Sequence, residues 1–137
     1  MSGTVALTGA TGFIGGTLCK ALAQGGFQVR ALTRRPQPAT VNVTWIHGDL
    51  ESPAAISTLL DGAHSLIHCA GVVRGKSRDE FDRINVAGTK AMVSACQACI
   101  PHPRLLFIST LAARSPDLSW YAASKAAAEA LIHDRGK

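Results

Sequence analysis

TVALTGATGFIG, residues 4–15, joins an apolar run to three glycines at every third position, Gly9, Gly12 and Gly15. The run is typical of a buried strand, and the residues after it follow a helical pattern that stops at Gly25-Gly26. Such glycines permit a tight turn, let the backbone approach a pyrophosphate and let the helix pack closely on the strand. The stretch therefore predicts a dinucleotide-binding turn, with a purely structural glycine turn as the alternative. No Gly-Lys-Ser/Thr follows, which excludes a P-loop.

Strand and helix patterns alternate along the rest of the chain. Strands are predicted at residues 4–10, 28–34, 43–50, 65–71 and 104–110, and helices at 13–24, 52–62, 78–99 and 120–135. Apolar strands that alternate with helices favour a parallel sheet covered on both faces, and right-handed crossovers then give a doubly wound α/β fold. We therefore expect one dinucleotide-binding Rossmann domain over residues 1–137, with five strands in the order 3-2-1-4-5.

The composition argues against several classes of protein. Hydrophobic residues make up 47% and charged residues 17%, as in a folded domain. The net charge of +5 is scattered and aromatic residues are few, so we expect no nucleic-acid surface. No apolar run is long enough to cross a membrane and no basic signal region begins the chain, so we expect a cytoplasmic protein. Cys96 and Cys99 lack a second pair of ligands, so we expect no metal site.

The end of the second predicted strand carries LTRRPQ, residues 32–37. In a dinucleotide-binding fold, an acidic side chain at this position would bind the ribose 2′-OH and favour NAD. Arg34 and Arg35 provide no carboxylate, and a guanidinium can pair bidentately with a 2′-phosphate. The stretch favours NADP over NAD, unless the two arginines are solvated loop charges.

SWYAASK, residues 119–125, places Tyr121 and Lys125 four residues apart, so that they share one helix face. A nearby ammonium stabilises a phenolate, which would let Tyr121 exchange a proton at neutral pH. Ser109 and Thr110 end the fifth predicted strand, and a hydroxyl there could polarise a substrate carbonyl. A tyrosine and lysine at this spacing occur on many helices, so the pair is informative because it follows the glycine loop.

Six motifs in order resemble the short-chain dehydrogenase/reductase superfamily, and more closely its extended or atypical branch of NAD(P)-dependent epimerases and dehydratases. The motifs are TGATGFIG at 8–15, GDL at 48–50, HCAG at 68–71, NVAGT at 85–89, FIST at 107–110 and YAASK at 121–125. The resemblance covers nearly the whole chain. Together with the arginine pair, it implies that the cofactor is bound by Gly9, Thr11, Gly12, Phe13, Ile14, Gly15, Arg34, Arg35, Asp49, Leu50, Ala70, Gly71 and Lys125.

The resemblance also implies a mechanism, a hydride transfer at the nicotinamide. Tyr121 would exchange a proton with the substrate oxygen, Thr110 would hold that oxygen, and Lys125 would bind the ribose and tune Tyr121. Asn85 would be a structural and relay residue. The implied substrates are small molecules such as nucleotide sugars or secondary alcohols and ketones. The implied assembly is a homodimer through helices 78–99 and 120–135.

The family's chains continue well beyond the length of this one, with the parts that close over the nicotinamide and bind substrate. We therefore expect an NADP-dependent oxidoreductase or epimerase/dehydratase portion that binds the cofactor with little turnover. The alternative is a non-catalytic module that senses NADP(H) or serves in an assembly.

Overall fold

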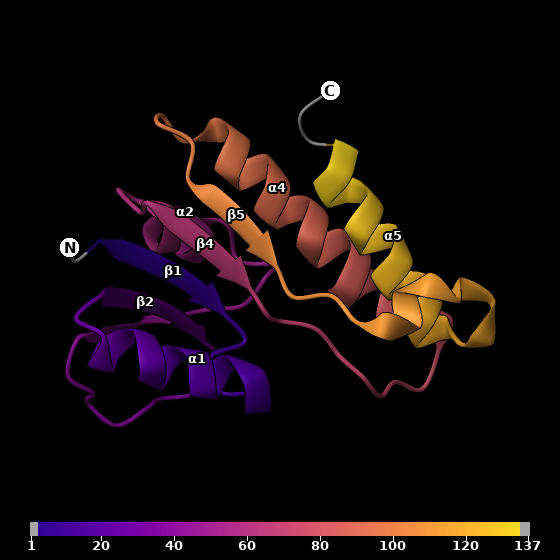
Figure 1. The fold of residues 1–137 in the computed structure, drawn as a ribbon, viewed down its shortest axis with the longest axis horizontal. Coiled ribbons are helices and arrows are strands. Elements are labelled where there is room, and N and C mark those ends of the chain that lie inside the picture. Colours follow the sequence, from indigo (N-terminus) through magenta and orange to yellow (C-terminus); the bar gives the residue numbers. More distant parts are fainter. Residues whose placement is uncertain (1–2, 135–137) are drawn as a thin grey trace.

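Five parallel strands form one sheet in a computed structural model of the chain, which describes residues 3–134 (Figure 1). The strands are β1 (Thr4–Thr8), β2 (Gln28–Thr33), β3 (Val43–His47), β4 (Ser65–His68) and β5 (Arg104–Phe107). Their order is β3-β2-β1-β4-β5, which confirms the predicted topology. The register pairs Thr8 with His68 and His68 with Phe107, so the loops after β1, β4 and β5 leave the sheet at one carboxyl edge.

Helices cover the sheet in two layers (Figure 1). They are α1 (Phe13–Gln24), α2 (Pro53–Leu60), α3 (Arg78–Phe81), α4 (Gly88–Ala98) and α5 (Trp120–Asp134). On one face, α1 packs against β1 and β2 around Leu7, Cys19 and Val29. On the other, α2 and α4 pack around Leu59, Leu66 and Met92. Residues from every central strand thus enter a core on each side, as the apolar strand patterns require.

The predicted helix 78–99 consists of three consecutive segments rather than one regular α-helix. Between α3 and α4 lies a π-helical segment, η1 (Asp82–Ala87), which contains Asn85. Two 3₁₀ turns that the sequence did not predict, η2 (Leu111–Arg114) and η3 (Pro116–Leu118), precede α5. The predicted end of the last helix, Arg135, lies outside the described residues.

The strands end earlier than the apolar pattern predicted, and β4 shows why. It was predicted to reach Gly71 but ends at His68. The N–H of Ala70 donates to the Thr8 hydroxyl at 3.1 Å, so the side chain of β1 takes a group that would otherwise extend the ladder. The residues after His68 turn out of the sheet and become available to line a site.

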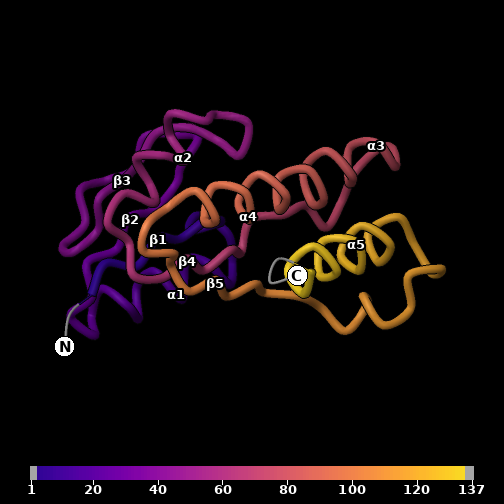
Figure 2. Tube along the Cα trace, turned by 90° about the horizontal axis from the view of Figure 1, so that it is seen from above, coloured from indigo at the N-terminus to yellow at the C-terminus, as the bar shows by residue number. Residues whose placement is uncertain are grey.

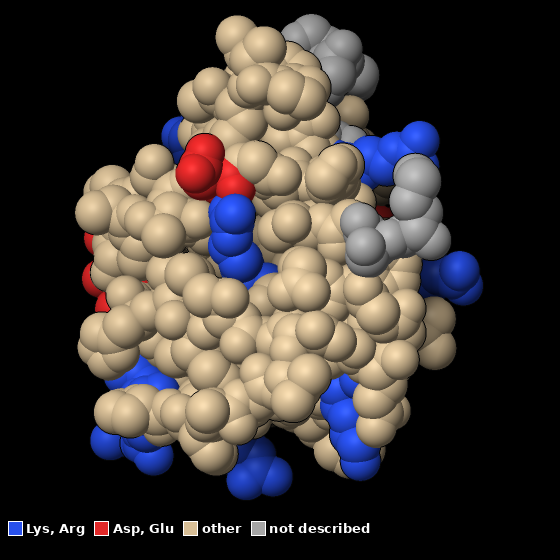
Figure 3. All heavy atoms as spheres, turned by 90° about the vertical axis from the view of Figure 1, so that its left-hand side faces the viewer, with Lys and Arg blue, Asp and Glu red and all other residues tan. Residues whose placement is uncertain are grey.

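Helices α4 and α5 lie side by side and contact each other (Figure 2). On the face drawn in Figure 3, the Lys and Arg side chains are dispersed and do not gather in one continuous patch. Within residues 3–134, none of the helices has the length and apolar character needed to span a membrane.

Candidate functional site

The glycine loop between β1 and α1 contains glycines of two kinds. Gly9 has a φ of +74°, and a Cβ there would lie 2.7 Å from the Ala70 nitrogen. A Cβ on Gly15 would run into the Gly9 carbonyl, so this residue lets α1 pack on the turn. A Cβ on Gly12 would meet only the Gly9 oxygen, at 3.3 Å, and Gly12 is exposed at the N-cap of α1. The fold needs Gly9 and Gly15, whereas Gly12 leaves room for a ligand at the helix N-terminus.

A cleft of about 350 Å³ opens beside this loop at the carboxyl edge of the sheet. Its walls come from the segments after β1, β2, β3 and β4 and from the π-helical segment η1. Of the predicted cofactor residues, it is lined by Gly9, Thr11, Gly12, Arg34, Asp49, Leu50, Ala70 and Gly71. The tertiary structure therefore brings together four segments that the sequence predicted separately.

The Thr33 hydroxyl decides which of the two arginines faces the cleft. Thr33 Oγ1 donates to the Arg35 carbonyl at 2.6 Å and accepts from the Arg35 N–H at 3.2 Å. These bonds tie the main chain of Arg35 back to the end of β2. Arg34 lines the cleft, and Arg35 does not.

The loop after β3 forms the wall opposite the glycine loop's first turn. Asp49 Oδ1 accepts from the Glu51 N–H at 2.8 Å and from the Ser52 hydroxyl at 3.0 Å, which shapes this loop. The Glu51 carboxylate pairs with the Arg83 guanidinium at 2.7 Å. This exposed ion pair joins the β3 loop to η1, and both of its residues line the cleft.

Two buried side chains hold the wall formed by residues 69–72. The Thr8 hydroxyl accepts the N–H groups of Cys69 and Ala70, both at 3.1 Å. Asn85 accepts the Val72 N–H at its Oδ1 at 2.8 Å and donates from Nδ2 to the Val72 carbonyl at 3.0 Å. Residues 69–72 are therefore held in place by side chains of β1 and η1.

His68 lies behind that wall and is fully buried. Its Nδ1 is 2.6 Å from Thr8 Oγ1, and its Nε2 is 3.0 Å from Thr89 Oγ1. Burial, with a smaller contribution from the Lys125 ammonium, lowers the pKa of His68 to about 3. The imidazole is therefore neutral at physiological pH.

The proposed proton-transfer residues lie beyond β5. Tyr121 and Lys125 stand one turn apart on α5, and the half-buried Tyr121 ring meets the Phe81 ring edge-on, with centroids 6.4 Å apart. Thr110 caps η2, which packs against α5, and its Oγ1 accepts the Ala112 N–H at 3.3 Å.

The two adjacent hydroxyls after β5 differ in what they can still donate. Ser109 Oγ donates to Glu129 Oε2 at 2.7 Å, so its proton is used. The bond of Thr110 to Ala112 uses only an acceptor site of the hydroxyl, so Thr110 keeps its proton for a substrate oxygen. Within residues 3–134, the hydroxyl proton of Thr110 is therefore unused, whereas that of Ser109 is not.

Lys125 is buried and held from two sides. Its Nζ donates to the Ile108 carbonyl at 3.0 Å and lies 4.3 Å from the centre of the Phe107 ring. Burial lowers the pKa of Lys125, while the charges of Cys69 and Glu129 oppose that shift. Burial raises the pKa of the Cys69 thiol to about 11, so the thiol is neutral at pH 7 and Glu129 is the counter-charge that acts there.

The match of a whole family's sequence pattern decides what kind of protein this is. The pattern of the NAD dependent epimerase/dehydratase family matches residues 5–137. The chain belongs to the NAD dependent epimerase/dehydratase family. Membership confirms the resemblance that the six motifs carry.

Other proteins are similar to this chain in sequence and fold. Ceramide reductase of Caulobacter vibrioides is 44% identical over 131 residues, which cover 93% of this chain and 41% of that protein. The structure of MoeE5 in complex with UDP-glucose and NAD is 31% identical with a TM-score of 0.84, covering 97% of this chain and 49% of that one.

UDP-glucuronic acid 4-epimerase from Bacillus cereus, in complex with NAD, shares the fold at 24% identity. Its TM-score is 0.82, and the match covers 96% of this chain and 52% of that one. The chain thus spans about half the length of these relatives, or less.

Other residues of the chain line the cleft without having been predicted: Leu32, Thr33, Gly48, Glu51, Cys69, Val72, Arg83 and Ile84. Most of them adjoin a predicted residue, which is the signal that could have found them. Arg83 and Ile84 come from η1, and nothing in their spacing connects them to the glycine loop. Conversely, Phe13, Ile14, Gly15, Arg35 and Lys125 do not line the cleft, and Phe13 is 93% exposed.

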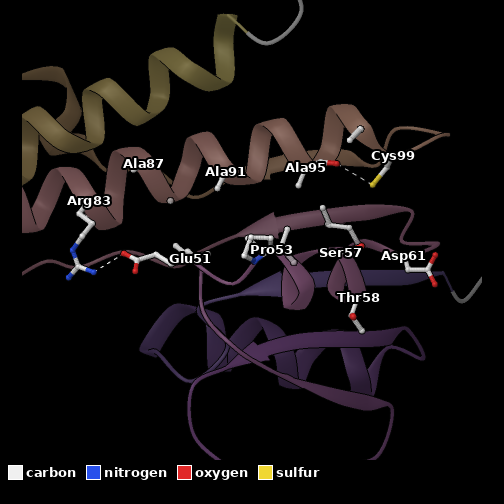
Figure 4. A pocket seen from close by; sticks show the side chains of 15 residues that line it. Glu51, Pro53, Ser57, Thr58, Asp61, Arg83, Ala87, Ala91, Ala95 and Cys99 are labelled. Atoms are coloured by element: carbon white, nitrogen blue, oxygen red, sulfur yellow. Dashed lines mark hydrogen bonds and ion pairs between the residues drawn. The ribbon is translucent and has the colours of Figure 1, made fainter.

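A larger hollow of about 790 Å³ lies between α2 and α4 (Figure 4). Small side chains such as Ala87, Ala91 and Ala95 line its α4 side, and the Glu51–Arg83 pair stands at one end. Leu50 is the one member of the predicted site that borders it. The smaller cleft, which most of the predicted cofactor residues line, is therefore the candidate site.

Proposed function

We propose that this chain binds a nicotinamide dinucleotide in the cleft beside the glycine loop and presents the proton-transfer groups for hydride exchange at a carbinol or carbonyl carbon. The observation that carries the proposal is the placement of two features at one edge of the sheet. The cleft, with Gly12 at the N-terminus of α1, takes a pyrophosphate. Thr110, Tyr121 and Lys125 follow the adjoining end of β5.

Each polar group then has a role that fits its surroundings. The nicotinamide would supply or accept the hydride. Tyr121 exchanges a proton with the substrate oxygen, and the free proton of Thr110 orients that oxygen. Lys125 provides a fixed positive charge beneath this position and reaches the ribose. Asn85 holds the 69–72 wall and, through Ser124, the first turn of α5.

For the choice of dinucleotide, we propose that Arg34 favours NADP. Its guanidinium lines the cleft after β2, where no carboxylate is present to bind a ribose 2′-OH. The solved relatives described above hold NAD, so NAD is the competing cofactor. Titration of both dinucleotides into one protein sample decides between them.

For the substrate, we propose a ketone or secondary alcohol on an apolar chain. Large apolar side chains flank the proposed catalytic residues and are exposed: Leu111 (78%), Leu118 (82%) and Trp120 (52%). The 44% identity to a ceramide reductase supports the same class. A nucleotide sugar is the second candidate, supported by the 31% identity to MoeE5, whose structure holds UDP-glucose.

For the assembly, we propose a homodimer through α4 and α5, which lie side by side (Figure 2). Ala127 and Ala130 on α5 and Ser94 and Ala98 on α4 are exposed and small, so helices of a second copy can approach closely. Sedimentation of the chain against Ala127→Glu tests this. A monomer in both cases removes the proposed dimer.

The central test is calorimetry with NAD, NADH, NADP and NADPH, followed by absorbance at 340 nm with ketones of short and long apolar chains and with UDP-glucose. We expect dinucleotide binding with little turnover, because the chain spans about half the length of its relatives. Binding of no dinucleotide at millimolar concentration contradicts the proposal. Binding with no turnover on any substrate favours the alternative, a module that binds NADP(H) without catalysis.

A further inference from the structure

A continuous series of hydrogen bonds runs through the protein from the glycine loop to Tyr121. It passes from Thr8 at the end of β1 to His68, then to Thr89 on α4, to Asn85 in η1 and to Ser124 on α5. Ser124 Oγ finally donates to the Tyr121 carbonyl at 2.8 Å. These five residues are all buried, and within the described part of the chain every buried side-chain nitrogen and oxygen has a partner.

The α4 end of the series determines which nitrogen of His68 carries the proton. Thr89 Oγ1 donates to the Asn85 carbonyl at 2.7 Å, and a carbonyl can only accept. A hydroxyl has one proton, so Thr89 must accept in its 3.0 Å contact with His68 Nε2. Nε2 is therefore the protonated nitrogen.

The β1 end gives the same answer independently. Thr8 Oγ1 accepts the N–H groups of Cys69 and Ala70, which fills both of its acceptor sites. Its own proton then points at His68 Nδ1, 2.6 Å away, which must be unprotonated. Both ends require the neutral Nε2–H tautomer, so the bonds have one direction from Thr8 to Thr89.

The same residues hold both sides of the proposed site. At one end, Thr8 fixes the main chain of Cys69 and Ala70 in the cleft wall. In the middle, Asn85 fixes Val72 with two bonds and donates to Ser124 at 3.0 Å. At the other end, Ser124 fixes the first turn of α5, where Tyr121 lies. The cleft wall and the tyrosine thus share one set of supports.

We propose that His68 and Thr89, held in this single tautomer, are positioning residues that set Tyr121 relative to the cleft wall. The inference rests on the proposed function for its purpose, although the hydrogen bonds themselves do not depend on it. Neither residue lines the cleft. Their effect is transmitted through Asn85 and Ser124.

Nuclear magnetic resonance of the whole chain tests the proposal, with ¹⁵N-labelled histidine and ¹³C-labelled tyrosine. Tyr121 is the only tyrosine, so its ring gives a single set of signals. In the wild type at pH 7 we expect His68 to carry a proton on Nε2 and none on Nδ1. Thr89→Val removes the acceptor of that proton, and should shift both the Nε2 signal and the Tyr121 ring signals. Thr89→Ser keeps the hydroxyl and should restore both.

Thr58→Val is the matched control. The Thr58 hydroxyl also donates to a carbonyl four residues back in its helix, that of Ala54 at 3.0 Å, but it is exposed on α2. This variant should leave the signals of His68 and Tyr121 in place. Ser124→Ala, one step from Tyr121, should move the Tyr121 signals with a smaller change at His68, and serves as the second probe if Thr89→Val does not fold.

Two results overturn the proposal. A proton on Nδ1, or on both nitrogens, at pH 7 contradicts the direction of the bonds. Tyr121 signals that Thr89→Val or Ser124→Ala leaves unchanged show that the series positions nothing on α5. Calorimetry on the same samples tests the proposed function separately. A chain that binds no dinucleotide contradicts the proposed function, whereas the His68 tautomer and the Tyr121 signals are measured without any dinucleotide.

Discussion

The two ends of the site differ in how completely they are built. At the glycine-loop end, segments after four strands enclose a cleft, and side chains such as Thr8, Thr33 and Asn85 tie down its walls. At the α5 end, Lys125 is also fixed, by its bond to the Ile108 carbonyl. Leu118 and Trp120, which precede Tyr121 in sequence, are nevertheless exposed. Cofactor binding and substrate turnover should therefore be separable in this chain. Cofactor binding depends on the enclosed cleft, whereas turnover depends on the exposed surface around the start of α5.

The largest expected effect is a loss of turnover from a change at the α5 end alone. Tyr121→Phe removes the phenolic proton, and should lower any rate of NAD(P)H consumption that the chain supports by roughly 10²–10⁴-fold. Dinucleotide affinity should stay within about twofold, since Tyr121 does not line the cleft. Initial rates at 340 nm and calorimetry measure the two quantities. Equal loss of both would show that the two ends are not independent.

The next largest effect is a loss of dinucleotide affinity from a change at the glycine-loop end alone. Gly12→Val places a side chain in the open space beside the α1 N-terminus, and should weaken dinucleotide binding by about 100-fold, or roughly 3 kcal/mol. The melting temperature should fall less than in Gly15→Ala, because a Cβ at Gly12 would meet only the Gly9 oxygen, at 3.3 Å. Gly15→Ala is the control with the opposite pattern. Its Cβ would run into the Gly9 carbonyl, so it should lower the melting temperature sharply.

His68, which belongs to the hydrogen bonds that both ends share, should make the free energy of unfolding depend on pH. The pKa of His68 falls from 6.5 to about 3 on folding, so the unfolded chain binds an extra proton between those values. This contribution to stability is fully present above pH 6.5 and is lost, by roughly 1 kcal/mol per pH unit, as the pH falls towards 3. Urea unfolding at pH 7 and pH 5 measures it.

His68→Asn cannot take up that proton and is the control for the pH prediction. Part of the pH dependence between pH 7 and pH 5 should disappear in this variant. The other four histidines, His47, His64, His102 and His133, are exposed and remain in both proteins, so they do not account for the difference. Identical pH dependence in the two proteins would exclude His68 as its source.

The smallest expected effect sharpens the glycine-loop end. Arg34→Asp replaces a cation that lines the cleft with a carboxylate, and should shift the NADP/NAD affinity ratio towards NAD by about tenfold or more. Arg35→Asp is the matched control, because Arg35 carries a similar charge next in sequence but does not line the cleft. A ratio that neither variant changes removes Arg34 from the choice of cofactor.

Much of the fold was predictable because its signals are local. The apolar runs predicted all five strands, the doubly wound Rossmann fold that they indicate predicted the strand order, and six short motifs predicted the family. Boundaries were less accurate where long-range bonds decide them. The end of β4 depends on a hydroxyl from β1, whose bond to Ala70 joins residues 62 apart in sequence. The π-helical turn around Asn85 was also not predicted, because its pattern of apolar residues reads as an ordinary helix.

The candidate site divides in the same way. Gly12 and Arg34 were predicted and line the cleft, since each adjoins the end of a strand. Arg83 was missed because only the packing of η1 brings it to Glu51. Thr110 was predicted from the resemblance to hold the substrate oxygen, whereas the bond from Ser109 to Glu129 on α5, which uses the Ser109 proton, was not predictable from the sequence.

The sequence by itself determined the strand order, the glycine turn, the family and the identity of most polar groups at the site. The strands and the glycine turn follow from side-chain periodicity and from the backbone freedom of glycine, which act over a few residues, whereas the strand order and the family follow from the succession of such motifs along the chain. Only the tertiary structure decided which arginine faces the cleft, which hydroxyl keeps its proton and which nitrogen of His68 carries one. Hydrogen bonds are directional and each hydroxyl has one proton, so the last two choices depend on partners that folding brings together from distant parts of the chain, Glu129 for Ser109 and both Thr8 and Thr89 for His68.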